Sequence, residues 1–342
     1  MHVKRARLTG VRQLIFEEID VGLDRLAPNA VCAETECTAV SVGTETAAYV
    51  GEPPLRPGPI YPRLVGYCNV ARVMRVGLGV SGVKPGDRIL THQSHQSGFE
   101  CDESGILVRI DEELPSEVAV MSYLAQLGLA ALQKGSFHAG EWVAVLGLGV
   151  IGLATTALAG CLGARVVALG NDASRLAKAA ELGADACFAS RDRTLRDRIE
   201  SVTAGKGIDL VITTANSWQA WKTAIEISRF QTKIAVLGFP GRTEGVPRFN
   251  PLDSAHFHDK QLTILGAGML EDSVGTSVSP RLQRNMEMVL TLVRKGRLPL
   301  ASLITHRVPW HQLESIYGLA ASRDKSLIGA VLDWTNQTRK VP

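Results

Sequence analysis

The sequence predicts an α/β protein in which a doubly wound parallel sheet accompanies a β-rich part. From residue 142 onwards, strand-like apolar runs alternate with helical patterns, which is typical of a parallel sheet with helices on both faces. A glycine-rich turn joins the first of these strands to its helix. Residues 1–50 instead alternate apolar and polar positions in short runs, as antiparallel strands do.

The remaining elements follow in order. Residues 51–62 are too rich in proline and glycine for regular structure, and helical structure is expected from Ser116 towards the glycine-rich turn. Short strands of the β-rich part are expected at 70–76, 88–91 and 107–110. The elements expected later in the chain are strands at 164–170, 210–213, 233–237, 262–265, 303–308 and 328–332, with helices at 218–227 and 281–295.

The most informative motif is Gly147-Leu-Gly149-Val150-Ile-Gly152, which follows an apolar, β-branched run and precedes a helix of small residues. In a Gly-x-Gly-x-x-Gly turn the first glycine suits the tight turn, and the second lets the backbone approach a pyrophosphate. The third lets the helix pack closely on the strand. The phosphates lie at the helix N-terminus, where Val150 stands. Because strand, turn and helix occur in the required order, the motif predicts a dinucleotide site, with which we group Thr213 from the strand at 210–213.

The end of the second parallel strand bears on the choice of cofactor. NAD-selective sites carry an Asp or Glu there, which binds the ribose 2′-hydroxyl. The corresponding residue here is Gly170, so no carboxylate repels a 2′-phosphate, and Asn171 and Arg175 are placed to donate to one. The sequence therefore favours NADP(H) over NAD(H). The alternative is that Arg175 is an ordinary exposed helix residue and that Asp172 binds the ribose.

Composition is that of a soluble cytoplasmic enzyme. The 342 residues, of which 45% are hydrophobic and 21% charged, suffice for two domains. A net charge of +3, spread along the chain, provides no basic stripe for nucleic acid. The N-terminus lacks the apolar core of a signal peptide. The apolar stretch 143–169 is interrupted by glycines and by Arg165, which indicates a buried βαβ unit and no membrane span. The six cysteines are dispersed, so no disulfide framework is expected.

Further motifs extend beyond the glycine turn. They are Gly43-Thr-Glu45, Gly66-Tyr-Cys68, Lys84-Pro-Gly-Asp-Arg88, Arg175-Leu-Ala-Lys-Ala-Ala-Glu-Leu-Gly-Ala-Asp185 and Leu303-Ile-Thr-His-Arg-Val-Pro309. Together they resemble the medium-chain dehydrogenase/reductase superfamily, of the zinc-type alcohol dehydrogenase kind, over essentially the whole chain. The nearest branch resembles bacteriochlorophyllide- and polyol-type dehydrogenases. The resemblance implies a GroES-like catalytic domain formed by residues 1–122 and 270–342, with a Rossmann domain at 123–269 inserted between them.

The resemblance also implies an assembly. The last Rossmann strand, Gln261–Gly266, is apolar and is expected at a sheet edge, which proteins normally protect by pairing. In the family this edge pairs with its twofold mate, so a homodimer is expected.

The chain departs from the family at the metal site. Zinc-dependent members carry ligands at three positions that are here Val42, Tyr67 and Ala125. A catalytic zinc needs three protein ligands of N, S or O type, and these residues do not supply them, so we expect a zinc-independent protein. The alternative is a rebuilt site formed by Cys68, His92 and His95.

Without a metal, other groups have to polarise a carbonyl and move its proton. Thr44 occupies the position of the family's proton-relay hydroxyl. Tyr67 occupies the lost zinc-histidine position, where its hydroxyl is either a hydrogen-bond donor or part of an aromatic filler. His95 is the third candidate because histidine titrates near neutral pH, although a polar-loop histidine is often only solvated. Glu45 commonly has a structural role in relatives.

These residues predict an oxidoreductase that transfers a hydride between NADP(H) and the carbonyl or alcohol of a small organic substrate. One alternative is an NADPH-dependent quinone or enone reductase, because zinc-free relatives commonly reduce activated C=C bonds. An alternative of another class is a cofactor-binding protein without turnover. Turnover on a panel of carbonyls, enones and alcohols would separate the three.

Overall fold

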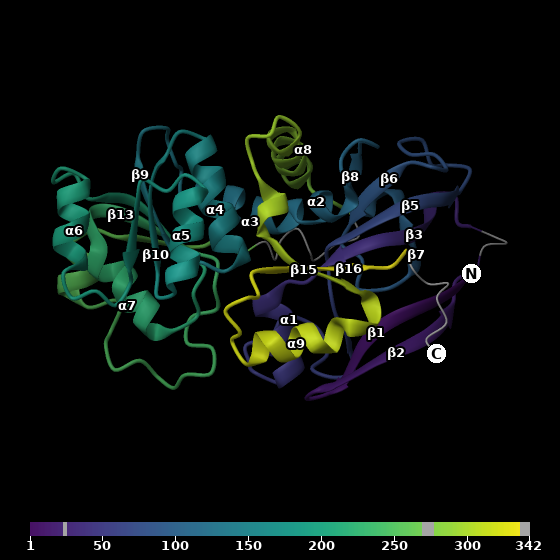
Figure 1. Cartoon of the computed structure of the whole chain (residues 1–342), viewed down its shortest axis with the longest axis horizontal. Helices are drawn as coiled ribbons and strands as arrows, with labels where there is room; N and C mark the ends of the chain where they lie inside the picture. The colour runs from purple at the N-terminus through teal and green to yellow at the C-terminus, as the bar shows by residue number, and fades with distance from the viewer. Residues whose placement is uncertain (23–25, 269–276, 336–342) are drawn as a thin grey trace. The chain divides into compact units, whose positions relative to one another are not determined.

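A computed structural model describes residues 1–22, 26–268 and 277–335 (Figure 1). The chain forms two compact units, and each is described by itself. Unit 1 comprises Met1–Tyr123, Leu270–Arg294 and Leu300–Pro342, and unit 2 comprises Leu124–Met269 and Lys295–Pro299. The segment Lys295–Pro299 groups with unit 2. Its Arg297 exchanges two hydrogen bonds with Cys161 of that unit, at 2.9 and 3.0 Å. The sequence alone does not separate this segment from its neighbours.

Unit 2 is built on a six-stranded parallel sheet of order β11-β10-β9-β12-β13-β14. Its strands are β9 (Trp142–Leu146), β10 (Arg165–Gly170), β11 (Ala186–Ala189), β12 (Ile208–Thr213), β13 (Ser228–Val236) and β14 (Thr263–Gly266). Its helices include α4 (Val150–Cys161), α5 (Ala173–Glu181), α6 (Leu195–Val202) and α7 (Trp218–Ile227), and α3 (Ser122–Lys134) begins at the unit boundary. The predicted doubly wound α/β fold is confirmed.

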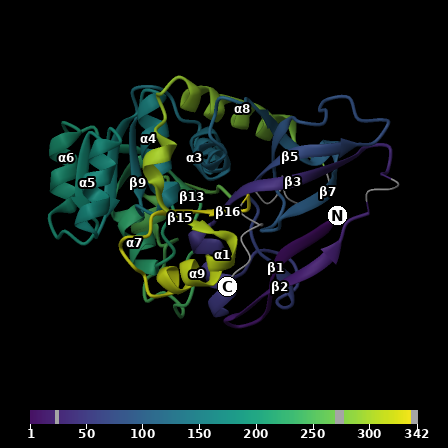
Figure 2. The same cartoon turned by 45° about the vertical axis from the view of Figure 1, so that its right-hand side comes forward.

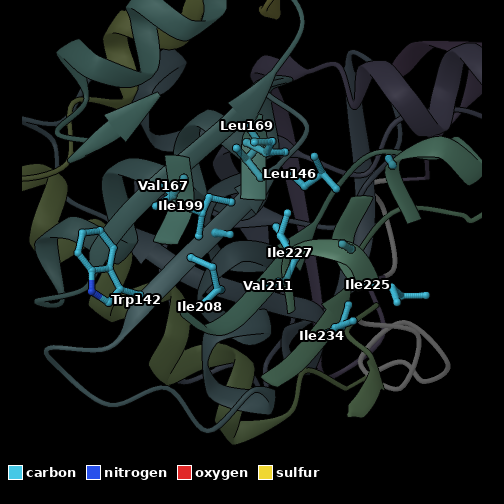
Figure 3. Close-up of a cluster of buried hydrophobic side chains, with 14 of the residues drawn as sticks. Trp142, Leu146, Val167, Leu169, Ile199, Ile208, Val211, Ile225, Ile227 and Ile234 are labelled. Carbon is cyan, nitrogen blue, oxygen red and sulfur yellow. The ribbon is translucent and has the colours of Figure 1, made fainter. Parts of the chain in front are cut away.

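The strands of this sheet are apolar on both faces. Ala144, Leu146 and Val211 belong to one buried cluster (Figure 3), whereas Val143 and Val145 belong to another on the opposite face. A parallel sheet covered by helices on both faces needs apolar residues at successive positions. This explains why the β9 sequence reads as a continuous apolar run and not as an alternating pattern.

Unit 1 contains two sheets. One has the order β2-β1-β4, and the other has the order β15-β16-β3-β5-β6-β8, with β7 paired to β3. The strands are β1 (His2–Gly10), β2 (Gln13–Asp20), β3 (Ala30–Ala39), β4 (Arg63–Leu64), β5 (Asn69–Val76), β6 (Arg88–Thr91), β7 (Gly98–Asp102), β8 (Ile106–Ile110), β15 (Ile304–Pro309) and β16 (Gly329–Asp333). The helices include α1 (Val42–Val50), α2 (Ser116–Val120), α8 (Pro280–Arg294) and α9 (Leu313–Ala321).

Helix α1 corrects the expectation that residues 1–50 form strands throughout. The carboxylate of Glu45 accepts a 2.7 Å hydrogen bond from the backbone N–H of Ser41, which satisfies an orphan donor at the helix start. Gly51 ends the helix in the left-handed conformation, with φ of 75°. The helix lies beside α9 in Figures 1 and 2, and Tyr49 packs on Tyr317 at a ring distance of 5.1 Å.

Within the described residues, no helix is long and apolar enough to cross a membrane. The stretch 143–169 forms β9, α4 and most of β10, as the βαβ interpretation expects. All six cysteines are free thiols, in agreement with their dispersed spacing.

Candidate active site

The glycine turn of unit 2 lies between β9 and α4. Gly147 has a φ of +98°, which favours glycine, and Gly149 precedes the helix. A Cβ on Gly152 would overlap the carbonyl oxygen of Gly147, so only glycine lets α4 begin this close to the strand. A Cβ on Gly149 would meet nothing within 4 Å. The backbone is therefore open at the position where a dinucleotide pyrophosphate would approach, and the turn fits that group.

Two threonines at the end of β12 behave differently. Thr213 is in register with Leu146 of β9. Its hydroxyl is buried without a hydrogen-bond partner among the described residues. Thr214, which the sequence reasoning missed, donates a 2.8 Å hydrogen bond to the carbonyl oxygen of Gly147. Thr214 could have been found from the sequence by its position directly after β12, the parallel strand that neighbours β9. Its hydrogen bond ties the glycine turn to the end of β12.

The end of β10 carries the groups expected to select the cofactor. Asn171 is exposed. The carboxylate of Asp172 caps α5 by accepting a 3.1 Å hydrogen bond from the Arg175 backbone N–H. The Arg175 guanidinium reaches back to the glycine turn, with 3.5 Å between Nη1 and the carbonyl oxygen of Leu148. A guanidinium therefore lies beside the turn, while Gly170 contributes no carboxylate.

In unit 1, a pocket of about 210 Å³ lies beside the start of α1. Thr44, Glu45 and Tyr67 line it, together with Arg56 and Arg63 from the loop before β4 and from β4 itself. The structure brings Thr44 and Tyr67 together in this pocket. The side-chain hydroxyl of Thr44 has no hydrogen-bond partner within the described part of the chain.

The contacts of Tyr67 are compatible with both roles considered from the sequence, a hydrogen-bond donor and an aromatic filler. Its ring is packed edge-on against Tyr123 at 5.7 Å, and the Arg56 guanidinium lies 4.3 Å from the ring centroid. Its hydroxyl is hydrogen-bonded to the hydroxyl of Ser41. Burial is the main cause that raises the pKa of Tyr67 to about 12, with a smaller contribution from the nearby Cys68. The phenol therefore stays protonated at neutral pH.

His95 is fully buried, with a side-chain exposure of 0%, and is not a solvated loop residue. Its Nδ1 lies 2.8 Å from the Thr38 hydroxyl and its Nε2 lies 2.7 Å from the Glu45 carboxylate. Tyr317 donates a 2.7 Å hydrogen bond to the same carboxylate. Gly66 makes room for the imidazole, because a Cβ there would lie 2.7 Å from the ring.

The Glu45 carboxylate is therefore held in a closed network. Burial raises its pKa, but the charge of His95 and the hydrogen bonds from His95 and Tyr317 outweigh burial, so the pKa is lowered overall. The ionised carboxylate fixes the first turn of α1, which carries Thr44. This agrees with the structural role expected of Glu45.

Comparisons with known proteins agree with this geometry. Residues 150–284 match a family model described as zinc-binding dehydrogenase. The NADP-dependent isopropanol dehydrogenase of Thermoanaerobacter brockii is 25% identical over 308 residues, covering 79% of this chain and 84% of the relative. The sorbitol dehydrogenase of Halalkalibacterium halodurans is 24% identical over 307 residues, covering 80% and 84%.

A solved alcohol dehydrogenase from Thermotoga maritima shares the fold, with a TM-score of 0.80, 20% identity, and coverage of 97% of this chain and 99% of that one. The chain is therefore similar in sequence to zinc-type alcohol dehydrogenases and shares the fold of a solved one. It is an oxidoreductase of the alcohol dehydrogenase type.

The residues at the three positions where the family resemblance expects zinc ligands are Val42, Tyr67 and Ala125. Val42 and Ala125 have no N, S or O atom in their side chains, and tyrosine is not among the usual zinc ligands, so these three residues do not fit a zinc ion. Among residues 1–22, 26–268 and 277–335, no three His, Cys, Asp or Glu side chains are grouped to hold a metal ion.

Proposed function

We propose that this protein transfers a hydride between NADP(H) and the carbonyl or alcohol of a small organic substrate, and that it does so without zinc. The observation that carries the proposal is that Thr44 and Tyr67 line the same pocket in unit 1. Their hydroxyls would take the place of a metal. When a hydride is transferred to a carbonyl carbon, negative charge develops on the carbonyl oxygen. Hydrogen bonds from two hydroxyl groups would stabilise that charge.

NADP(H) is the cofactor that the residues of unit 2 favour. When bound, it supplies or accepts the hydride. The open turn at Gly149 would hold the pyrophosphate, and Arg175, with Asn171 beside it, would bind the 2′-phosphate. The related isopropanol dehydrogenase of Thermoanaerobacter brockii is named as NADP-dependent, which supports the same choice.

The hydroxyls of unit 1 would serve the reacting oxygen in two ways. Thr44 has a donor free for the oxygen because it bonds to no described side chain. The Tyr67 hydroxyl donates to the Ser41 hydroxyl in this structure. Since both hydroxyls can donate and accept, Ser41 can instead donate to Tyr67, and the Tyr67 proton is then available to the substrate oxygen. In carbonyl reduction, the hydride goes to carbon and the proton from one of these hydroxyls goes to oxygen. That hydroxyl would then regain a proton from water.

His95 acts in this proposal through Glu45 and not on the substrate, because its side chain is fully buried. The hydrogen bonds from His95 and Tyr317 keep Glu45 ionised and in place. Glu45 in turn holds the first turn of α1, so His95 is a positioning residue for Thr44.

We also propose that the protein is a homodimer that pairs at β14. This strand is the last in its sheet order, and Thr263 on it is exposed. Beside it lies an apolar groove lined by Trp218, Phe257 and Ile264. An unpaired strand edge beside an apolar surface is normally covered, and a second copy would cover both.

The proposal is tested with Thr44→Val and Tyr67→Phe, assayed for NADPH-dependent reduction of a carbonyl panel and for NADPH affinity. Removing one donor to a developing oxyanion typically costs about 10²–10³ in rate. NADPH affinity should stay nearly constant, because neither residue belongs to unit 2. Thr46→Val is the matched control, since its hydroxyl is buried on the same helix without a partner among the described residues.

The outcomes separate the three functions. Loss of turnover in both variants but not in Thr46→Val supports carbonyl chemistry. Full turnover of an enone by both variants favours C=C reduction, which needs no strong acid at the carbonyl. NADPH binding without turnover of any carbonyl, enone or alcohol favours a cofactor-binding protein.

A further inference from the structure

The unit 1 pocket contains two arginines that the oxygen chemistry does not use. Arg56 lies in the proline-rich loop 51–62, and its guanidinium carbon is 4.3 Å from the ring centroid of Tyr67. Arg63 begins β4, and its Nη2 donates a 3.1 Å hydrogen bond to the carbonyl oxygen of Arg56. Both side chains line the same pocket as Thr44. Two positive charges therefore lie beside the hydroxyls proposed to bind the reacting oxygen.

No described carboxylate forms an ion pair with either arginine. Other arginines of unit 1 do have such partners. Arg5 and Arg7 pair with Glu17, and Arg72 and Arg88 pair with Glu36. The two pocket guanidiniums are thus partly buried positive charges. No carboxylate of the described residues neutralises them.

The carboxylate of Glu45 does not neutralise them. It lines the pocket, but only 3% of its side chain is exposed. Its oxygens are occupied by the backbone of Ser41, by His95 and by Tyr317. The pKa of Arg63 is lowered, first by burial and then by the charge of Arg56, as expected of a cation that faces another cation.

The loop that carries Arg56 and leads directly to Arg63 is stiff. Its sequence, Gly51-Glu-Pro-Pro-Leu-Arg-Pro-Gly-Pro-Ile-Tyr-Pro62, contains five prolines, each of which fixes a backbone φ angle. The hydrogen bond from Arg63 to the Arg56 carbonyl ties the end of the loop to its middle. Less conformational entropy is lost when a ligand binds to a site that is already ordered.

We propose that Arg56 and Arg63 bind an oxyanion carried by the substrate, a carboxylate or a phosphate monoester, so that the substrate is an anionic alcohol or ketone. A guanidinium offers paired N–H donors that match the oxygens of either group. A pocket of about 210 Å³ suits a short molecule that carries both the reacting oxygen and the anion. This inference rests on the proposed function, because it assigns the substrate class of the same pocket.

Binding is tested without turnover. The full chain is saturated with NADP⁺, so that its turn in unit 2 is filled, and is then titrated with inorganic phosphate in a calorimeter. Arg56→Gln and Arg63→Gln should each weaken phosphate binding roughly 10- to 100-fold, which is the loss expected for a charged hydrogen bond. Arg12→Gln is the matched control. The Arg12 guanidinium also lies over a tyrosine ring, 5.8 Å from the ring centroid of Tyr49, but Arg12 does not line the pocket.

Phosphate binding that is absent in the wild type, or that falls equally in all three variants, would overturn the proposal. A loss of NADP⁺ affinity in Arg56→Gln and Arg63→Gln, with substrate selectivity unchanged, would overturn it too, since the pair would then belong to the cofactor. Unfolding curves for all three variants show whether the fold is retained. A Lys at each position, which keeps the charge, should recover part of the binding.

Kinetics then identify the anion. Secondary alcohols with a carboxylate, with a phosphate monoester and with neither are compared by kcat/KM with NADP⁺. The ratio of the better anionic substrate to the neutral one should exceed about 10 in the wild type and fall in both pocket variants, with Arg12→Gln unchanged. A wild-type preference for neutral alcohols would refute the anion assignment and leave the proposed dehydrogenase intact. Pocket-specific phosphate binding without turnover of any alcohol would instead refute the proposed function and leave the anion site intact.

Discussion

Alanine at two positions of the glycine turn should separate cofactor binding from folding. Gly149 has φ of −77° and ψ of −173°, which alanine adopts without strain, and its added Cβ would meet nothing within 4 Å. The weaker helix cap and the stiffer unfolded chain have opposite effects, so Gly149→Ala should change the free energy of unfolding by less than about 1 kcal/mol. The Cβ would nevertheless occupy the space proposed for the pyrophosphate. Loss of one charged hydrogen bond there would weaken NADPH binding by roughly 10-fold or more.

Gly152→Ala is the contrasting variant. Its Cβ would overlap the carbonyl oxygen of Gly147 and lie 2.9 Å from the carbonyl carbon. Since this neighbour is backbone, α4 would have to shift, and overpacking of this kind costs about 1–3 kcal/mol or more. Urea unfolding and NADPH fluorescence titration measure both effects. The reasoning is refuted if Gly149→Ala binds NADPH as tightly as the wild type, or if Gly152→Ala is as stable as Gly149→Ala.

Three further predictions follow from other parts of the chain. Arg175→Ala should weaken NADPH binding about 10-fold and NADH binding less. Gly170→Asp should shift the cofactor preference towards NADH, provided that the Leu148 side chain, 2.8 Å from the new Cβ, moves aside. Equal effects on NADPH and NADH binding would count against the 2′-phosphate site. Because the pKa of Tyr67 is raised above its usual value of 10 to about 12, the stability it contributes should be constant below pH 10 and decline between pH 10 and 12. Unfolding of wild type against Tyr67→Phe measures this, and a decline already at pH 8 would contradict it. Light scattering should give twice the 36.7 kDa chain mass, and a charge at the exposed edge, Thr263→Lys, should give monomers; a monomeric wild type would exclude the β14 dimer.

The fold could be predicted largely because its signals are local. The strand at 88–91 and the helix at 218–227 have the predicted bounds, since apolar runs and turn residues mark them in the sequence. Helix α1 was missed because its start depends on Glu45, whose placement requires His95 and Tyr317 from distant segments. A local pattern of alternating residues does not carry that information.

The candidate site shows the same limit. Thr44 and Tyr67 could be placed by comparison with a family motif, and they line one pocket. The position of Arg56 could not, because an irregular loop leaves no periodic signal and its contact with Tyr67 is set by tertiary folding. His95 was expected in a polar loop, yet it is buried because Gly66 leaves space for its ring. Cofactor preference, the catalytic roles and the dimer stay predictions.

The central claim is that the hydroxyls of Thr44 and Tyr67 replace a metal at the reacting oxygen. The most direct measurement is NADPH-dependent reduction of carbonyl substrates by protein that has been treated with a chelator. Elemental analysis then gives the number of zinc ions per chain. We expect full turnover with far less than one zinc per chain. Turnover that is lost on chelation and restored by one equivalent of zinc would contradict the claim, and it would favour a site rebuilt from Cys68, His92 and His95.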